Sequence, residues 1–226
     1  QSIGITLEAV VWLGINPILT FGDEQQKQRW LPDLVAGRAL AAFGLTEAEA
    51  GSDAGATKTR AQLADGEWTL NGSKAFITNS GTSITSVVTV TARTGENELS
   101  TIMVPSGTPG FVVEPAYDKL GWHISDTHGL SFDDCRVPEQ NLLGVRGRGF
   151  KQFLAVLDDG RIAISALAVG LAQACLDVSV RYANERHTFG APIGSRQAAA
   201  FSLSDPAVAV AAARPPRVGR LICRAG

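Results

Sequence analysis

Residues 45–61 read LTEAEAGSDAGATKTRA, a stretch with almost no large side chains. Apolar sequence typical of β-strands lies on both sides of it. A segment this bare in the middle of a globular chain is either an ordinary turn or a loop whose backbone N–H groups and hydroxyls come close to a ligand. The residues around the stretch decide between these two interpretations.

Composition limits the classes of function. The 226 residues suffice for one large domain or two small ones, and the net charge of −2 without long runs of like charge predicts no binding to nucleic acid. The three cysteines are far apart, which argues against a disulfide framework or a metal site and favours a reducing compartment. The uncharged, apolar run 162–176 is too short to span a bilayer and predicts a buried helix, so we also expect no membrane.

Periodicity divides the chain into three blocks. Residues 1–37 carry apolar residues at helical spacing, interrupted at Asn16 and Pro17. Residues 39–143 contain short β-rich runs separated by turn residues at intervals of about ten residues, which predicts an antiparallel sandwich or open barrel. Helical periodicity returns from Phe150. The expected fold class is therefore α+β, with a helical segment, a central antiparallel β-barrel or sandwich domain and then long helices.

Local signals add two further expectations. Asp65-Gly66 and Asn71-Gly72 are dipeptides typical of tight turns and predict two consecutive turns. The chain begins inside a helical pattern, and two adjacent prolines, Pro215 and Pro216, predict the end of the last helix. Both ends favour the interpretation that the sequence is a piece of a longer protein.

Three segments, in their order and spacing, resemble the acyl-CoA dehydrogenase family. They are AFGLTEAEAGSD at 42–53, AFITNSG at 75–81, and the segment from LDDGR to NERHTFGAPIGSRQ at 157–197. The resemblance implies a helical domain, a central β domain and a C-terminal four-helix bundle, with the cofactor FAD between the last two. Residues 1–38 are then the end of the N-terminal helical domain, 39–144 the β domain, and 145–226 a truncated C-terminal domain with an incomplete bundle.

The resemblance assigns residues in the first two segments to the flavin. In the loop, the implied FAD contacts are Phe43, Leu45, Thr46, Gly51 and Ser52, and Ser52 also meets the CoA. In the strand they are Phe76, Ile77 and Thr78, with Thr78 hydrogen-bonded to flavin N5. Ala48-Glu49 replaces the Pro-Gly usual in relatives, and Phe76 stands where relatives often have Trp. The alternatives are a plain surface loop and an ordinary strand with one face in the core.

The third segment supplies the remaining implied contacts. Asp158 and Arg161, at i and i+3 on one helix face, meet the acyl-CoA, or else form an exposed ion pair. The hairpin residues Arg186, Thr188, Phe189 and Gln197 reach the FAD of a neighbouring subunit, or else end a solvated helix. Some relatives carry their catalytic glutamate where this chain has Gly160, whose missing side chain indicates that room is needed there. No catalytic residue is therefore assigned, and the base is expected in a C-terminal region that this chain lacks.

The resemblance implies an FAD-dependent acyl-CoA dehydrogenase, which oxidises an acyl-CoA thioester to a trans-2-enoyl-CoA. An electron-transfer flavoprotein is the expected acceptor, and a homo-oligomer, either a dimer or a tetramer, is the expected assembly. The expected location is the bacterial cytoplasm, or the mitochondrial matrix if the source is eukaryotic. Two alternatives stay open: a flavin oxidase or monooxygenase on the same fold, and a truncated, non-catalytic product. This chain alone is expected to be inactive.

Overall fold

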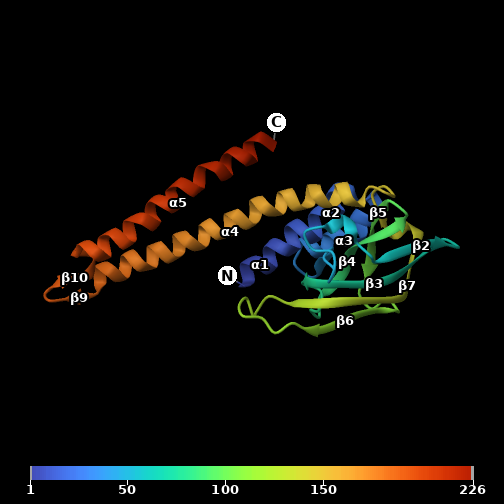
Figure 1. Cartoon of the computed structure of the whole chain (residues 1–226), viewed down its shortest axis with the longest axis horizontal. Helices are drawn as coiled ribbons and strands as arrows, with labels where there is room; N and C mark the ends of the chain where they lie inside the picture. The colour runs from blue at the N-terminus through green and yellow to red at the C-terminus, as the bar shows by residue number, and fades with distance from the viewer. Residues whose placement is uncertain (1, 225–226) are drawn as a thin grey trace. The chain divides into compact units, whose positions relative to one another are not determined.

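The computed structural model describes residues 2–224 of the chain (Figure 1). It divides into two compact units, Gln1–Gly160 and Arg161–Gly226. The first unit contains the sheet and the N-terminal helices, and the second consists of a helical hairpin. The long helix α4 begins in the first unit and ends in the second.

The N-terminal block is helical, as its periodicity predicts. Its elements are α1 (Ser2–Glu8), a π-helix η1 (Ala9–Ile15), α2 (Asn16–Phe21) and α3 (Glu24–Val35). Pro17 lies in the first turn of α2, which follows η1 directly: Ile15 and Asn16 both have helical φ and ψ, so the expected interruption does not end the helical path. Asp23 caps α3 through a reciprocal pair of hydrogen bonds with Gln26, of 2.7 and 3.1 Å.

The strands of the first unit form one sheet in the order β6-β7-β3-β2-β4-β5-β8, with β1 beside β4. Their bounds are β1 (Leu40–Gly44), β2 (Arg60–Ala64), β3 (Glu67–Thr78), β4 (Thr85–Gly95), β5 (Glu98–Pro105), β6 (Phe111–Ala116), β7 (Thr127–Pro138) and β8 (Leu142–Leu143). Most neighbours are antiparallel, as expected, but β4 pairs in parallel with both β1 and β2. Strands that are not joined by a hairpin are free to run in the same direction.

Of the two predicted turns, one is confirmed and one is wrong. Asp65 and Gly66 both have positive φ and join β2 to β3. Asn71 and Gly72 instead lie within β3, where the pairing with β7 shifts register. Gly72 has a φ of +143°, and a Cβ there would lie 2.7 Å from the Cα of Thr59. The glycine therefore permits a β-bulge and a close approach of two backbones rather than a turn.

Both faces of β4 are buried, which explains why its sequence is apolar without strict alternation. Val88 and Val90 belong to the larger core, with Trp68 and Leu70 of β3. Val87, one position earlier, faces a second core beneath the N-terminal helices. That second core also contains Ile18, Leu34, Ala39, Ala41, Met103 and Leu143. The sheet thus fixes the position of the segments that enter and leave its central strands.

The second unit is a hairpin of the end of α4 (Gly149–Glu185) and α5 (Gln197–Arg224). The connection contains β9 (His187–Thr188), β10 (Ala191–Pro192) and a 3-10 turn, η4 (Ile193–Ser195). Contrary to the prediction, α5 continues through Pro215 and Pro216.

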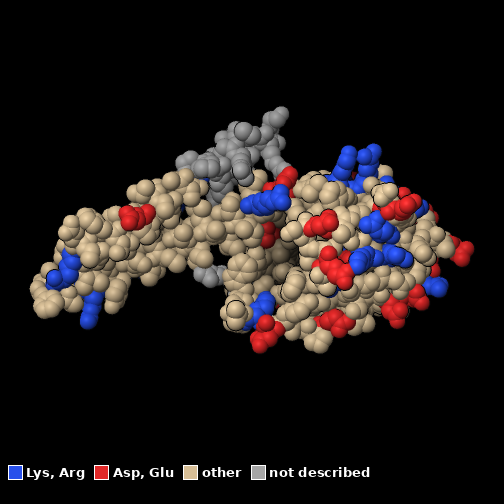
Figure 2. Space-filling model, viewed as in Figure 1, with Lys and Arg blue, Asp and Glu red and all other residues tan. Residues whose placement is uncertain are grey.

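The predicted burial of 162–176 is wrong for the described structure. Ile164 and Leu171 are 40% and 36% exposed. Figure 2 shows few charged side chains along this hairpin, in contrast to the first unit. The hydrogen bond from Arg214 to Gln173, of 2.7 Å, links the two helices.

Two stretches of the described residues, Ile3–Phe21 and Gly149–Glu185, are long and apolar enough to cross a membrane. Helices that pack against others inside a protein without a membrane satisfy the same two criteria. Length and hydropathy alone therefore do not indicate a membrane protein, and the expectation of no membrane stays a prediction.

Candidate functional site

The small-residue loop after β1 makes a tight turn and then a short helix. Glu47 and Ala50 exchange backbone hydrogen bonds of 3.1 and 3.2 Å across Ala48-Glu49, the pair that replaces Pro-Gly. A 3-10 turn, η2 (Ala54–Ala56), follows. Gly51 and Ser52 lie between these two turns and are exposed. The loop therefore contains a true turn and also presents its backbone to solvent.

A buried ion pair lies under this loop. The Glu47 carboxylate is 2.7 Å from Nζ of Lys74, and the two side chains are 7% and 0% exposed. The carboxylate also accepts hydrogen bonds from the backbone N–H groups of Lys58 and Thr59, at 2.7 and 3.1 Å. Nζ of Lys74 donates to the carbonyl oxygen of Leu45 at 3.1 Å. The loop is thus attached to β3 through polar contacts.

The sequence analysis missed both members of this pair. Lys74 stands inside a β-rich run, where a lysine is usually solvent-exposed, and Glu47 stands in a polar loop. The sequence contained one weak signal for Lys74. Alternation along β3 after the bulge at Gly72 places Lys74 on a buried face, where a charged side chain needs a partner.

Burial changes the pKa of both partners. It lowers the pKa of Lys74 to about 8, and the Glu47 carboxylate opposes this fall. Burial also acts to raise the pKa of Glu47. The hydrogen bonds and positive charge of Lys74, together with the donors of Lys58 and Thr59, outweigh burial, so the pKa of Glu47 lies below its usual value. Both groups are therefore charged at neutral pH.

Phe76, one of the implied FAD contacts, carries an exposed ring on a strained bulge. Phe76 has a φ of +60° and is 64% exposed, and its ring centroid lies 4.9 Å from that of Tyr117. The pairing of β3 with β7 shifts register between Lys74 and Ile77. A bulky residue with positive φ is an outlier, and such strain is concentrated at functional sites. Ile77 is buried in the larger core, so only its backbone could face a ligand.

The structure brings part of the loop next to this bulge. The backbone N–H of Ala75 donates to the carbonyl oxygen of Thr46 at 2.8 Å, which places Thr46 beside Phe76. Thr78 follows two residues later, half-buried and opposite Thr127 of β7. Phe43, at the end of β1, stacks on Phe153 of α4, with 6.3 Å between the two ring centroids. The structure therefore places Thr46 of the loop beside the part of β3 that carries Phe76 and Thr78.

On α4, Asp158 and Arg161 are both exposed, as contact with a ligand or solvent requires. Asp159 instead accepts a hydrogen bond from the side chain of Asn16 at 3.2 Å. A Cβ on Gly160 would lie 3.7 Å from Leu13 and 3.8 Å from the Glu8 carboxylate, both ordinary contacts. Packing against these neighbours therefore does not require a glycine. Burial raises the pKa of Glu8, a residue that the sequence analysis did not consider.

In the second unit, the predicted hairpin residues lie at a tight turn. Phe189 and Gly190 both have positive φ, and the Phe189 ring is 96% exposed. Arg196, which was not predicted, donates to the Thr188 carbonyl oxygen at 2.8 Å, and its guanidinium lies 5.0 Å from the Phe189 ring centroid. Arg186 is exposed, and Figure 2 shows positive charge at this end of the hairpin. Gln197 begins α5 and is also exposed.

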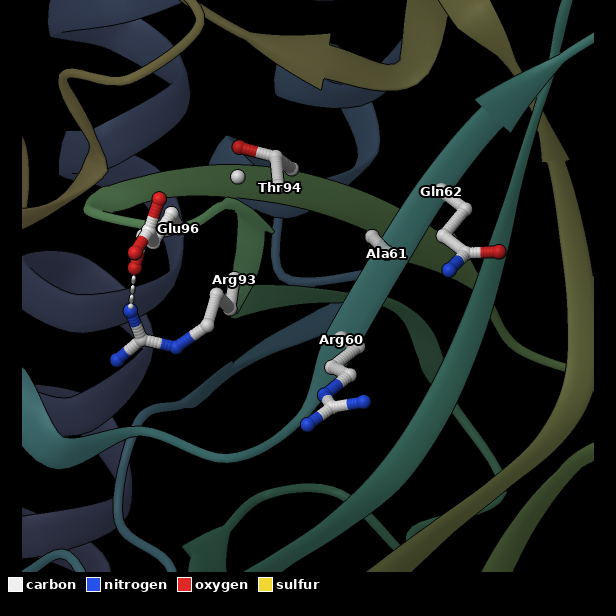
Figure 3. Close-up of a pocket in the computed structure, with 7 residues that line it drawn as sticks. Arg60, Ala61, Gln62, Arg93, Thr94 and Glu96 are labelled. Carbon is white, nitrogen blue, oxygen red and sulfur yellow. Dashed lines mark hydrogen bonds between the residues drawn. The ribbon is translucent and has the colours of Figure 1, made fainter.

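A surface hollow of about 480 Å³ lies elsewhere on the sheet, and no predicted site residue lines it. Its lining, shown in Figure 3, comprises Arg60, Ala61, Gln62, Arg93, Thr94, Gly95 and Glu96. The Arg93 guanidinium donates to the carbonyl oxygens of Glu96, Gly55 and Thr57, at 2.7, 3.2 and 3.3 Å. Arg93 therefore anchors the far end of the loop, which is a structural role.

Comparison with known proteins identifies the family. Three domain models of acyl-CoA dehydrogenases match the chain: the N-terminal domain at residues 1–38, the middle domain at 42–135 and the C-terminal domain at 147–215. The chain belongs to the acyl-CoA dehydrogenase family, which confirms the resemblance drawn from the sequence.

Individual relatives agree with this assignment. The probable acyl-CoA dehydrogenase YngJ of Bacillus subtilis is 48% identical over 216 residues, covering 94% of this chain and 57% of the relative. The mitochondrial short-chain specific acyl-CoA dehydrogenase of Rattus norvegicus is 45% identical over 215 residues, covering 94% of this chain and 52% of the relative. The chain thus spans about half the length of these relatives.

Solved structures confirm the fold class. Butyryl-CoA dehydrogenase from Megasphaera elsdenii matches with a TM-score of 0.92 and 42% identity, over 96% of this chain and 58% of that one. An acyl-CoA dehydrogenase complexed with FAD from Bacillus anthracis matches with a TM-score of 0.88 and 36% identity, over 92% of this chain and 36% of that one.

The pKa of Lys74 predicts a pH dependence of stability. We expect the Cε signal of Lys74 in NMR to titrate near pH 8, and to titrate lower in Glu47→Gln, because the opposing carboxylate is gone. The unfolded chain keeps this proton up to a pH of about 10.4. Between about pH 8 and about pH 10.4, the unfolded chain therefore binds more protons than the folded chain. The contribution of Lys74 to the unfolding free energy rises with pH across this window. Lys74→Met should remove the rise; a midpoint above pH 10 would contradict the prediction.

Replacement of Gly160 by alanine tests whether the glycine serves packing. Gly160→Ala should raise the unfolding free energy by about 1 kcal/mol, because alanine is the better helix former. The new Cβ would meet only ordinary contacts. Gly170→Ala on the same helix, with no atom within 4 Å of its Cβ, is the matched control and should give a similar gain in urea unfolding. A loss of stability confined to Gly160→Ala would show tighter packing than these contacts indicate.

Proposed function

We propose that this chain carries the flavin-binding part of an FAD-dependent acyl-CoA dehydrogenase that acts on short acyl-CoA thioesters. The observation that carries the proposal is the exposed Phe76 ring on its strained bulge, next to Thr46 and Thr78. A planar heteroaromatic ligand needs an apolar surface beside its ring and hydrogen-bond donors along its edge. The names of the rat and Megasphaera elsdenii relatives support the short acyl chain.

The residues present fit the cofactor. Phe76 would cover one face of the flavin ring and keep water from it, while the Thr46 and Thr78 hydroxyls would donate to its polar edge. Gly51 and Ser52 leave the exposed loop backbone free to approach the diphosphate and the CoA. When bound, FAD supplies a hydride acceptor for the β-carbon of the thioester.

The exposed residues of α4 and of the hairpin complete the proposed contacts. Asp158 and Arg161 would hold the CoA, and a bidentate guanidinium such as that of Arg186 suits a diphosphate. Arg186, Thr188, Phe189 and Gln197 would serve the FAD of a neighbouring subunit. We therefore propose a homo-oligomer, either a dimer or a tetramer. An electron-transfer flavoprotein as acceptor, and a bacterial cytoplasm or mitochondrial matrix as location, follow from the family and are part of the proposal.

We assign no general base within this chain. Asp159 is bonded to Asn16, and Asp158 is expected to contact the CoA. Abstraction of the α-proton needs a placed carboxylate, whose contribution to rate is roughly 10²–10⁴-fold. We therefore propose that the chain binds FAD but does not turn over. Bleaching of the flavin by butyryl-CoA would contradict this, and Glu8→Gln would then be the first variant to make, because Glu8 lies beside Gly160.

FAD binding by the purified chain tests the proposed ring site. Thr46→Val and Thr78→Val should each weaken FAD binding about two- to tenfold, since one net hydrogen bond contributes about 0.5–1.5 kcal/mol. Thr69→Val, on the same strand as Thr78 but outside the site, should leave the affinity unchanged. The measurement is a titration of FAD fluorescence. Wild-type affinity in both site variants would show that these hydroxyls do not hold the ring.

The role of Arg186 predicts a dependence on assembly. Arg186→Ala should lower the ratio of FAD to protein, and the loss should grow on dilution, because the contact is proposed to cross between subunits. Lysine should restore retention only in part, since it lacks the guanidinium fork. Arg181→Ala, which changes an exposed arginine in the last turns of α4, is the control and should retain FAD. Sedimentation measured alongside absorbance checks the prediction, and a fully flavinated monomer would contradict it.

A further inference from the structure

The contacts of Lys74 fix the direction of one peptide group in the loop. Its Nζ donates to Leu45 O at 3.1 Å, Glu47 Oε1 at 2.7 Å and Thr91 Oγ1 at 3.3 Å. An ammonium has three donors, so each of them has one acceptor. The side chain is 0% exposed, and the acceptors come from the loop and from β4. The ammonium therefore occupies one defined position beneath the loop.

This position determines where the next N–H points. The Leu45–Thr46 peptide is trans, so its C=O and N–H point in opposite directions. Because the Leu45 carbonyl points toward the buried ammonium, the Thr46 N–H points away from it. The Thr46 carbonyl is held separately by the N–H of Ala75 at 2.8 Å. Within the described residues, neither the N–H nor the hydroxyl of Thr46 has a hydrogen-bond partner.

Charge adds to this geometric effect. A cation that hydrogen-bonds to a peptide carbonyl polarises the peptide and makes its N–H a stronger donor. Glu47 keeps that cation inside the protein, because the carboxylate balances its charge and is itself held by the N–H groups of Lys58 and Thr59. The pair thus presents one activated, unpartnered donor beside the exposed ring of Phe76.

We propose that Lys74 and Glu47 are a positioning pair, which holds the Leu45–Thr46 peptide so that the Thr46 N–H is presented to the flavin ring. Neither residue would touch the cofactor. The part of this inference that concerns flavin rests on the proposed function, whereas the orientation of the peptide does not depend on it. The two parts therefore need separate measurements.

Two variants separate positioning from folding. Lys74→Met removes all three donors and leaves the buried Glu47 carboxylate without its cation. Adding Glu47→Gln removes the unbalanced charge but does not restore the donor to Leu45. The control is Asn141→Leu, which also deletes a buried side-chain bond to a carbonyl, that of Met103 at 2.8 Å. The control lies at η3 (Glu139–Asn141), which contains none of the predicted site residues.

Hydrogen exchange in the chain without FAD tests the orientation. The reporters are the N–H groups of Glu47, Ala50 and Ala75, which are bonded within the loop or to Thr46. We expect the double variant to exchange at least tenfold faster at these amides, with the amides of β5 unchanged. Asn141→Leu should leave the three reporters at wild-type rates. Wild-type rates at all three in the double variant would overturn the inference, whatever the result with FAD.

FAD binding and the flavin absorption spectrum test the second part. The double variant should bind FAD at least tenfold more weakly, or shift the flavin bands, while Asn141→Leu binds as the wild type does. Fast exchange together with wild-type affinity and spectrum would show that the loop is positioned for something other than flavin. If the wild-type chain itself binds no FAD, the proposed function is wrong, and the exchange rates alone decide the orientation.

Discussion

The loop of residues 45–59 depends on the buried ion pair between Glu47 and Lys74. A loop of small residues has little apolar surface to bury, so the packing of Ala50 and Ala54 contributes less to its order than polar contacts do. Removing two charges from water is costly unless they are paired and fully hydrogen-bonded, and both conditions are met here. Such a pair adds little net stability, but it permits few alternative geometries. The ion pair thereby orders the loop backbone, while the loop at Gly51 and Ser52 stays exposed to solvent.

Much of the fold could be predicted because its signals are local. Alternation identified the strands, and Asp65-Gly66 identified a hairpin turn. The errors arise from long-range contacts. The parallel pairing of β1 with β4 has no local sequence signature, and Asn71-Gly72 forms a bulge because Thr59, which is distant along the chain, approaches Gly72. The exposure of α4 likewise depends on what else packs against it.

The candidate site divides in the same way. Residues that a motif names, such as Thr46 and Phe76, could be listed from the resemblance. The residues that hold them could not. Lys74 and Glu47 meet across 27 positions of sequence, and a lysine within a strand ordinarily indicates a solvent-facing side chain. Arg196 was missed because its role is to support Thr188 and Phe189, which becomes visible only once the turn at Phe189-Gly190 is formed.

The predicted site residues are distributed over two units, and contacts within each unit fix the conformation of the residues that it contains. In the first, the buried pair and the bulge at Phe76 fix the loop and the ring. In the second, the turn and Arg196 fix Thr188 and Phe189. Most of the conformational entropy of these residues is therefore lost when the chain folds rather than when a ligand binds. The positive φ of Phe76 fits this interpretation, because the register shift between Lys74 and Ile77 leaves the Phe76 ring exposed while Ile77 is held in the larger core.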